Sequence, residues 1–269
     1  WIEKFEEDYF TRRSRTPKTE TTWKKHYRAI FRRLPQEREL TPQILLDAVT
    51  ATKADTASRK QACIVTGALG KFAQIEFDPK PYRGSYSPKR AKPRDLPDDN
   101  TIAEWFYKIQ NPSWRWVYGI LACYGLRPHE VFHIDPDSLQ EEPGILTLKD
   151  GKTGGRRIWP CYPEWWREFG LGTIQLPAVH GRANSELGER VTQYLRRNAR
   201  LPFVPYALRH CWAIRTLEFG LDLSLASQQM GHSVQVHTDL YHHWISDRHH
   251  QRAFELLMSR EDRPQPPAL

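Results

Sequence analysis

Two arginines in the second half of the chain are placed where each could bind an anion, such as a carboxylate or a phosphate. Arg127 comes two residues after Gly125, where a helical stretch stops, so its side chain extends from a rigid corner. Arg209 comes three residues after Tyr206, and on a helix the two share a face. Arginine is always ionised and offers a bidentate fork of N–H donors, which suits phosphate oxygens. Taken alone, Arg127 with Glu130 three residues later is more often a structural salt bridge.

A tyrosine further along the chain lies among histidines, and a tyrosine hydroxyl is a possible nucleophile. Tyr241 ends the segment GHSVQVHTDLY and follows His232 by nine residues. A tyrosine that attacks a phosphodiester keeps the bond energy in a covalent link, so that the bond can be remade. Free tyrosine has a pKa of about 10, so neighbouring cations and a proton acceptor must supply about 4 kcal/mol near pH 7. Exposed tyrosines are common, so Tyr241 indicates a function only together with the cations and the proton acceptor that would activate it.

The histidines and cysteines do not predict a metal site. The histidine cluster consists of His242, His243, His249 and His250, without an HExxH or Cys/His pattern. The cysteines are Cys63, Cys123, Cys161 and Cys211, which are far apart along the chain. We therefore expect no metal, no other cofactor and reduced thiols, as in a reducing cytosol.

The overall charge favours a polyanionic partner. The 269 residues carry a formal net charge of +8, with an isoelectric point of about 9.3 and a mean hydropathy of −0.70. A basic surface attracts polyanions, most often nucleic acid. No apolar run approaches the roughly 18 residues of a membrane span, and we expect no membrane association. Because the first residue is Trp1, we expect the chain to be a fragment or a processed product.

Periodicity predicts a mainly helical chain with one small β-hairpin, an α+β class. Residues 1–78 read as a helical bundle with an apolar stripe at Trp23, Tyr27 and Phe31, and further helices from Pro42 and near 56–74. Residues 79–97 are rich in proline and basic residues and read as a linker. Residues 98–269 read as a second domain, with helices near 114–124, 185–199, 206–219 and 222–230. Its hairpin lies between GILTLKD and RRIWP.

Basic residues of the first helical domain and of the linker are the candidates for contacts with DNA. In the linker, a solvated loop is the alternative to a strap that lies against phosphates. The candidates are Lys24, Lys25, Arg28, Lys89, Arg90, Lys92 and Arg94.

The chain resembles the tyrosine recombinase (phage integrase) family in four ordered motifs. GLRPHE is similar to the family's GLR-x-x-E box, and YALRH to the start of its C-terminal motif. A Gly-His pair and a Thr-x-x-Tyr end follow at the family's spacing, and GKTGGRRIWP resembles its mobile β-turn. The resemblance covers residues 98–250 strongly. More loosely, the helical N-terminal part resembles the family's core-binding domain, and the second domain is then of the integrase catalytic type.

The resemblance implies a role for each motif residue. Arg127, Arg209 and His232 would donate to the phosphate, and Glu130 would orient the site from behind. Tyr241 would be the nucleophile that forms a 3′-phosphotyrosine. The general acid for the leaving 5′-oxygen would be Lys152, with Lys149 as the alternative because hairpin alignments slip.

One position departs from the family pattern. Tyr206 stands where the family usually has histidine, and a phenol can donate a hydrogen bond to phosphate but is a poor base near neutral pH. His210 does not simply replace it, because adjacent residues point about 100° apart around a helix. The departure leaves the path of the proton open.

By resemblance, the chain is expected to act on double-stranded DNA as a homotetramer in the cytoplasm, at the nucleoid of a prokaryote, in DNA integration or excision. The apolar tail residues either dock on a neighbouring protomer or pack on their own domain. Two other functions remain open: a binding protein of the same fold without catalysis, favoured only by Tyr206, and a type IB topoisomerase. The tail residues are Ala253, Phe254, Leu256, Leu257 and Met258.

Overall fold

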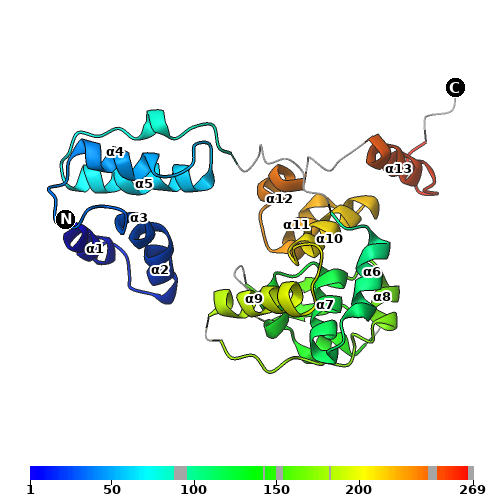
Figure 1. The fold of residues 1–269 in the computed structure, drawn as a ribbon. Helices are drawn as coiled ribbons and strands as arrows, with labels where there is room; N and C mark the ends of the chain where they lie inside the picture. Colours follow the sequence, from blue (N-terminus) through cyan, green and yellow to red (C-terminus); the bar gives the residue numbers. More distant parts are fainter. Residues whose placement is uncertain (88–95, 142, 150–153, 182, 242–246, 266–269) are drawn as a thin grey trace. The chain divides into compact units, whose positions relative to one another are not determined.

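The chain forms two compact units, which are described separately. A computed structural model describes all residues except 88–95, 142, 150–153, 182, 242–246 and 266–269 (Figure 1). The first unit runs from Trp1 to Ala91 and the second from Lys92 to Leu269.

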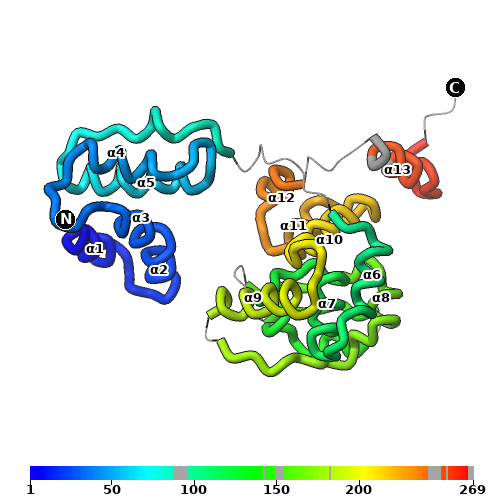
Figure 2. Tube along the Cα trace, viewed as in Figure 1, coloured from blue at the N-terminus to red at the C-terminus, as the bar shows by residue number. Residues whose placement is uncertain are grey.

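Threonine caps define where the helices of the first unit begin. Thr16, Thr41 and Thr56 each have extended backbone, and each hydroxyl accepts a hydrogen bond from the amide three residues later. Proline follows two of these threonines at the first helical position. The helices, traced from blue to cyan in Figure 2, are α1 (Ile2–Thr11), α2 (Pro17–Thr22) with the π-helical segment η1 (Trp23–Arg28) and α3 (Ala29–Phe31), α4 (Pro42–Thr50), α5 (Ala57–Phe72) and the 3₁₀ turn η2 (Lys80–Tyr82).

Aromatic side chains form much of the core of the first unit. Phe5 and Tyr9 of α1 pack on Trp23, with ring centroids 6.1 and 5.1 Å apart, and Phe31 lies 5.6 Å from Phe5. All four side chains are buried. This packing confirms the predicted stripe on one face of the helix and leaves the basic residues of the same helix on the other.

The second unit is a helical domain with one β-hairpin. The side chain of Asp98 caps α6, and that of Asn111 caps α7. Gly125 and Gly231, both in the left-handed conformation, end α7 and α11. The elements are α6 (Asp99–Lys108), α7 (Pro112–Tyr124), the 3₁₀ turns η4 (Pro128–His133) and η5 (Pro136–Leu139), β1 (Leu146–Leu148), β2 (Arg156–Ile158), α8 (Pro163–Glu168), α9 (Asn184–Gln193) with the π-helical segment η6 (Tyr194–Asn198), α10 (Ala207–Glu218), α11 (Leu223–Met230), α12 (Val234–Tyr241) and α13 (Asp247–Met258).

The hairpin is held to the helical core on one face. Strands β1 and β2 are antiparallel, with Leu146 opposite Ile158 and Leu148 opposite Arg156. The three apolar side chains among these are buried. Because alternate residues of a strand face the same side, Arg156 lies on the inner face with Ile158, while Arg157 is exposed.

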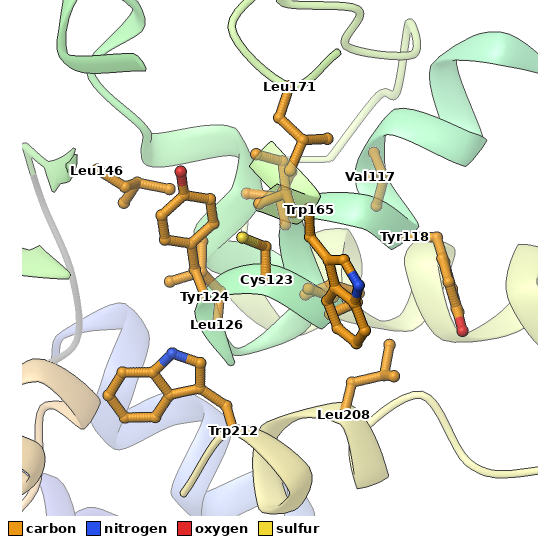
Figure 3. Packing of buried hydrophobic residues seen from close by; sticks show 14 of the residues in the cluster. Val117, Tyr118, Cys123, Tyr124, Leu126, Leu146, Trp165, Leu171, Leu208 and Trp212 are labelled. Carbon is orange, nitrogen blue, oxygen red and sulfur yellow. The ribbon is translucent and has the colours of Figure 1, made fainter. Parts of the chain in front are cut away.

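Helix α7 is the centre of the second core, and the candidate site begins at its end. Figure 3 shows Tyr124 and Leu126 among side chains from β1 and α10, including Leu146 and Trp212. The Trp212 indole donates to the carbonyl of Trp159, just after β2, at 3.3 Å. Core packing therefore joins α7, the hairpin and α10 at the place where Arg127 leaves the helix.

Gly125→Ala is expected to destabilise the protein by about 3 kcal/mol. Gly125 has φ +60°, and an added Cβ would lie 2.6 Å from the Cβ of Trp212. Gly170 has φ +62° with nothing within 4 Å of an added Cβ, so Gly170→Ala is the matched control and should cost about 1 kcal/mol. Urea unfolding of both variants measures the difference, and equal losses would mean that the Trp212 contact is unimportant.

The predicted fold class is confirmed: the structure is mainly helical with a two-stranded antiparallel sheet. The helix through Trp23 begins earlier than the apolar stripe indicated, because Thr16 and Pro17 start it. The two π-helical segments were not anticipated, since no sequence pattern used here marks a wider turn.

Candidate active site

Arg127 is fixed on both sides of its guanidinium. Its Nη1 donates to Oε1 of Glu130 at 2.7 Å, and its Nη2 donates to the carbonyl of Gly231 at 3.0 Å. The carboxylate of Glu130 also accepts from the backbone N–H of Arg127 at 2.8 Å. The side chain of Arg127 is 17% exposed. The guanidinium is thus held in one orientation while part of it still reaches solvent.

Glu130 is fully buried between two arginines. Besides Arg127, it accepts from Nη2 of Arg156 at 2.8 Å. Burial acts to raise the pKa of Glu130, but the charges of Arg156 and Arg127 and the backbone N–H of Arg127 together hold it below its usual value. Glu130 is therefore an anion near pH 7 that orients two guanidiniums.

Arg156 is a site residue that the sequence argument missed. Its Nε donates to the carbonyl of Gln229 at 2.7 Å, so it joins the hairpin to α11. Its Nη1 is buried and has no hydrogen-bond partner among the described residues. The signal that would have found it is strand alternation, because Arg156 and Ile158 occupy the same face of β2.

Arg209 is buried in α10 and is held by main-chain oxygens. Its Nη1 donates to the carbonyl of Gly125 at 2.8 Å and its Nη2 donates to the carbonyl of Met230. Burial, followed by repulsion from Arg127, lowers the pKa of Arg209. Arg127 and Arg209 therefore donate to consecutive carbonyls, those of Gly231 and Met230, and lie close enough to repel. An anion placed between them removes that repulsion.

His232 follows these two carbonyls directly and hydrogen-bonds a second histidine. Its Nε2 lies 3.0 Å from Nδ1 of His237. Burial, then the charge of Arg209, lowers the pKa of His232 to about 3. His232 is neutral near pH 7 in the structure and can donate one N–H bond to a ligand beside the arginines.

Tyr241 lies at the end of α12, buried against these histidines. Its side chain is 2% exposed, and its ring centroid is 4.7 Å from that of His237 and 6.3 Å from that of His232. Burial raises the pKa of Tyr241, while the charge of Arg209 opposes that rise. The hydroxyl is therefore protonated in the structure and needs a proton acceptor before it can attack.

Tyr206 precedes α10 and is the most exposed member of the group. Its side chain is 42% exposed, and its ring centroid is 5.3 Å from that of His210. It lies one helical turn before Arg209, as its spacing predicted. From there it can donate a hydrogen bond to a phosphate oxygen.

The candidate general acid lies outside the described residues, since Lys152 falls within 150–153. The alternative, Lys149, is described: its Nζ pairs with Asp135 at 3.0 Å on the outside of the hairpin. This ion pair holds the side chain of Lys149 against Asp135, in the segment that joins η4 and η5.

A pocket of about 590 Å³ adjoins His232 between the hairpin and α11. Arg156, Trp159 and Gln229 line it together with Gly231 and His232. The backbone N–H of Trp159 donates to the side chain of Gln229 at 2.8 Å, which holds this wall in place.

The candidate DNA contacts of the first unit are exposed. Lys24, Lys25 and Arg28 lie on the outer face of η1. Lys89, Arg90, Lys92 and Arg94 lie outside the described residues.

The described parts of the chain contain no group of three or more His, Cys, Asp or Glu side chains that could hold a metal ion. None of their helices is long and apolar enough to span a membrane. The four cysteines are free thiols, and burial raises the pKa of Cys211 to about 11.

Sequence comparisons relate the chain to excisases. Residues 1–83 match the XisA/XisC excisase second domain. Excisase A of Nostoc sp. is 31% identical over an alignment of 279 positions, gaps included, which covers 91% of this chain and 58% of that protein. Excisase C of the same organism is 27% identical, over 97% of this chain and 57% of that protein. The chain thus spans less than two thirds of the length of these relatives.

The class of protein follows from the fold and the site together. Lambda integrase residues 75–356, solved bound to DNA, superimposes with a TM-score of 0.62 at 15% identity, covering 98% of each chain. The Tn1549 transposon integrase gives a TM-score of 0.59 at 14% identity over 96% of this chain and 99% of that one. Tyrosine recombinase XerD of Pseudomonas putida is 28% identical over 46% of this chain and 47% of its own. The chain belongs to the tyrosine recombinase (phage integrase) family.

Proposed function

We propose that this chain is a site-specific DNA recombinase that cleaves and rejoins DNA through a 3′-phosphotyrosine at Tyr241. One observation carries the proposal: Arg127 and Arg209 are anchored on the adjacent carbonyls of Gly231 and Met230, directly beside His232. Tyr241 lies buried against the His232 and His237 rings. Two fixed cations, a neutral donor and a phenol therefore converge from four separate segments.

The arrangement suits attack on a phosphodiester. Negative charge grows on the non-bridging oxygens during attack, and donors already fixed in place stabilise it without reorganisation. Arg127 and Arg209 supply that charge, and His232 and Tyr206 add hydrogen bonds. The phosphotyrosine product retains the energy of the broken bond, so rejoining needs no nucleotide cofactor.

The leaving 5′-oxygen needs a proton from outside this cluster. We assign it to Lys152, on the turn between the hairpin strands, as the resemblance to the family implies. Lys149 is the weaker candidate because Asp135 already pairs with it.

Tyr241→Phe is expected to abolish covalent capture of DNA. Supercoiled plasmid that carries the junction sequences of the encoding element is incubated with the chain, denatured with detergent and analysed for a protein–DNA adduct. Removal of the hydroxyl removes the nucleophile, so no adduct should form, whereas filter binding to the same plasmid should be unchanged.

Tyr162→Phe is the matched control, because Tyr162 is a partly buried tyrosine of the same unit that donates to Asp99 at 2.7 Å, away from the site. It should form adduct as the wild type does. An adduct that survives in Tyr241→Phe contradicts the assigned nucleophile. Tight binding without an adduct in the wild type favours a binding-only protein. Relaxation of a plasmid that carries one site, without strand exchange when a second site is supplied, favours a type IB topoisomerase.

We further propose that the protein works on paired DNA sites as a tetramer. One of the structural neighbours is a lambda integrase tetramer bound to a Holliday junction, at a TM-score of 0.62. Helix α13 exposes apolar side chains, which a neighbouring protomer would cover: Phe254, Leu256, Leu257 and Met258. The names of the two Nostoc relatives favour excision as the outcome.

A further inference from the structure

A buried histidine beside Tyr241 has no part in the chemistry described so far. His237 lies on α12 one helical turn before Tyr241, and its side chain is 1% exposed. Three histidine rings contact the ring of Tyr241. The centroid of His237 is 4.7 Å away, that of His210 5.6 Å and that of His232 6.3 Å. His237 is the nearest of these three possible proton acceptors.

The hydrogen bond between the two histidines fixes which nitrogen of His237 is free to accept. Nε2 of His232 and Nδ1 of His237 are 3.0 Å apart, so one of them donates. If His232 donates its Nδ1–H to a phosphate, it is neutral with an unprotonated Nε2, which must accept from His237. His237 then carries its proton on Nδ1, and its Nε2 presents a lone pair.

That lone pair is buried and has no hydrogen-bond donor among the described residues. Nε2 of His237 has no hydrogen-bond partner among the described residues, and a buried acceptor without a partner is costly. Helices α10 and α11 pack on α12. Helix α11 carries no titratable side chain between Leu223 and Met230. Tyr241 lies on the same face of α12, and its hydroxyl must give up a proton during the proposed reaction.

We propose that Nε2 of His237 accepts the hydroxyl proton of Tyr241 when Tyr241 attacks the scissile phosphate. The proposal rests on the proposed function. The Tyr241 oxygen forms its bond to phosphorus, its proton moves to His237, and the bond from phosphorus to the 5′-oxygen breaks. The 5′-oxygen takes a proton from the general acid on the hairpin. Rejoining reverses each transfer, so protons balance without a further reactant.

The charges around His237 fit a base that becomes active only with DNA bound. Burial, then the charge of Arg209, lowers the pKa of His237 to about 4, so the ring is neutral at pH 7. The other titratable groups on this side include His210, Tyr206 and Cys211 from α10 and its start, with His232 and Tyr241 themselves. A phosphodiester anion bound at Arg209 offsets the repulsion and makes His237 more basic. Tyr206, a phenol, is a poor base at this pH.

His237→Gln is expected to slow cleavage about 100-fold at pH 7, because glutamine cannot take up a proton. The probe is a duplex that contains the cleavage site mapped on the plasmid, with sulfur in place of the bridging 5′-oxygen. A thiolate leaves without protonation, so the single-turnover rate reports proton removal from Tyr241 and not the general acid. For the variant, the rate should rise about tenfold per pH unit between pH 6 and 9, while the wild type levels off once His237 is neutral.

Two further variants separate proton acceptance from packing. His237→Ala leaves a ring-sized space, and added imidazole should restore its cleavage rate. His210→Gln removes the second nearest histidine and should keep the wild-type pH profile. Thermal melting and filter binding confirm that each variant is folded and binds the probe.

The proposal is overturned if His237→Gln cleaves at the wild-type rate, or if it is slow with a wild-type pH profile and imidazole does not restore His237→Ala. Either result leaves the proposed function standing, because the wild type still forms its Tyr241 adduct. If the wild type forms no adduct on this probe, both proposals fail.

Discussion

Arg209→Lys is expected to reduce the single-turnover cleavage rate about 1,000-fold, since it removes a fixed donor from the developing charge. The guanidinium of Arg209 donates to Gly125 and Met230 at once, and a lysine ammonium cannot span both carbonyls. Arg127 is then the one guanidinium of the pair that is left to face the phosphate. Cleavage of the mapped duplex, measured well below the melting temperature, gives the ratio of rates.

Arg215→Lys provides the matched control for this loss. Arg215 lies on the same helix, is equally buried, and pairs with Asp99 at 2.6 Å while donating to the carbonyl of Ala122. Its replacement should lower the melting temperature without a comparable loss of cleavage by the folded protein. If both variants lose cleavage in proportion to their stability, Arg209 has a structural role only.

Glu130→Gln is expected to destabilise the protein by about 3–5 kcal/mol near pH 7, as the loss of one partner from a buried ion pair does. The carboxylate serves Arg127 and Arg156 together, and glutamine leaves both guanidiniums without their counter-charge. The control is Glu104→Gln, which removes an exposed pair with Lys108 and should change stability by less than about 1 kcal/mol. Urea unfolding at pH 7 compares the two.

The pH dependence of this difference has a definite sign. The pKa of Glu130 is lowered in the folded protein, so the ion pairs contribute fully above the unfolded-state value of 4.5. Their contribution is lost as the pH falls through the folded-state pKa. The difference in the free energy of unfolding between wild type and Glu130→Gln should therefore be constant from pH 6 to 7 and decrease below about pH 4. A gap that widens in acid would contradict the assigned charge state.

Much of the fold was predictable because local signals agree with the packing. The apolar stripe through Trp23 and Phe31 is the buried face of the observed helix. Pro42 after Thr41 and Gly125 after Tyr124 mark a start and an end that the structure confirms. Such signals act between residues that are close in sequence, so the helix boundaries that they predict do not depend on how distant parts of the chain pack.

Part of the site was beyond sequence patterns because it depends on long-range pairing. The partnership of Glu130 with Arg156 joins residues 26 apart and forms only when β2 pairs with β1. His237 belongs to none of the motifs in the sequence, yet its spacing of four from Tyr241 places both residues on one face of α12. The convergence of Arg127, Arg209, His232 and Tyr241 agrees with the resemblance, while their roles in the chemistry stay predictions.

The position of the covalent link is the direct test of Tyr241 as the nucleophile. The adduct formed by the wild type is digested with nuclease and trypsin, and the peptides are weighed by mass spectrometry. Cleavage after Arg215 and Arg248 releases residues 216–248, whose only tyrosine is Tyr241, whereas Tyr206 lies in residues 201–209. The nucleotide remnant is expected to add its mass to residues 216–248, on the tyrosine. A remnant on residues 201–209, or on any other peptide, would contradict it.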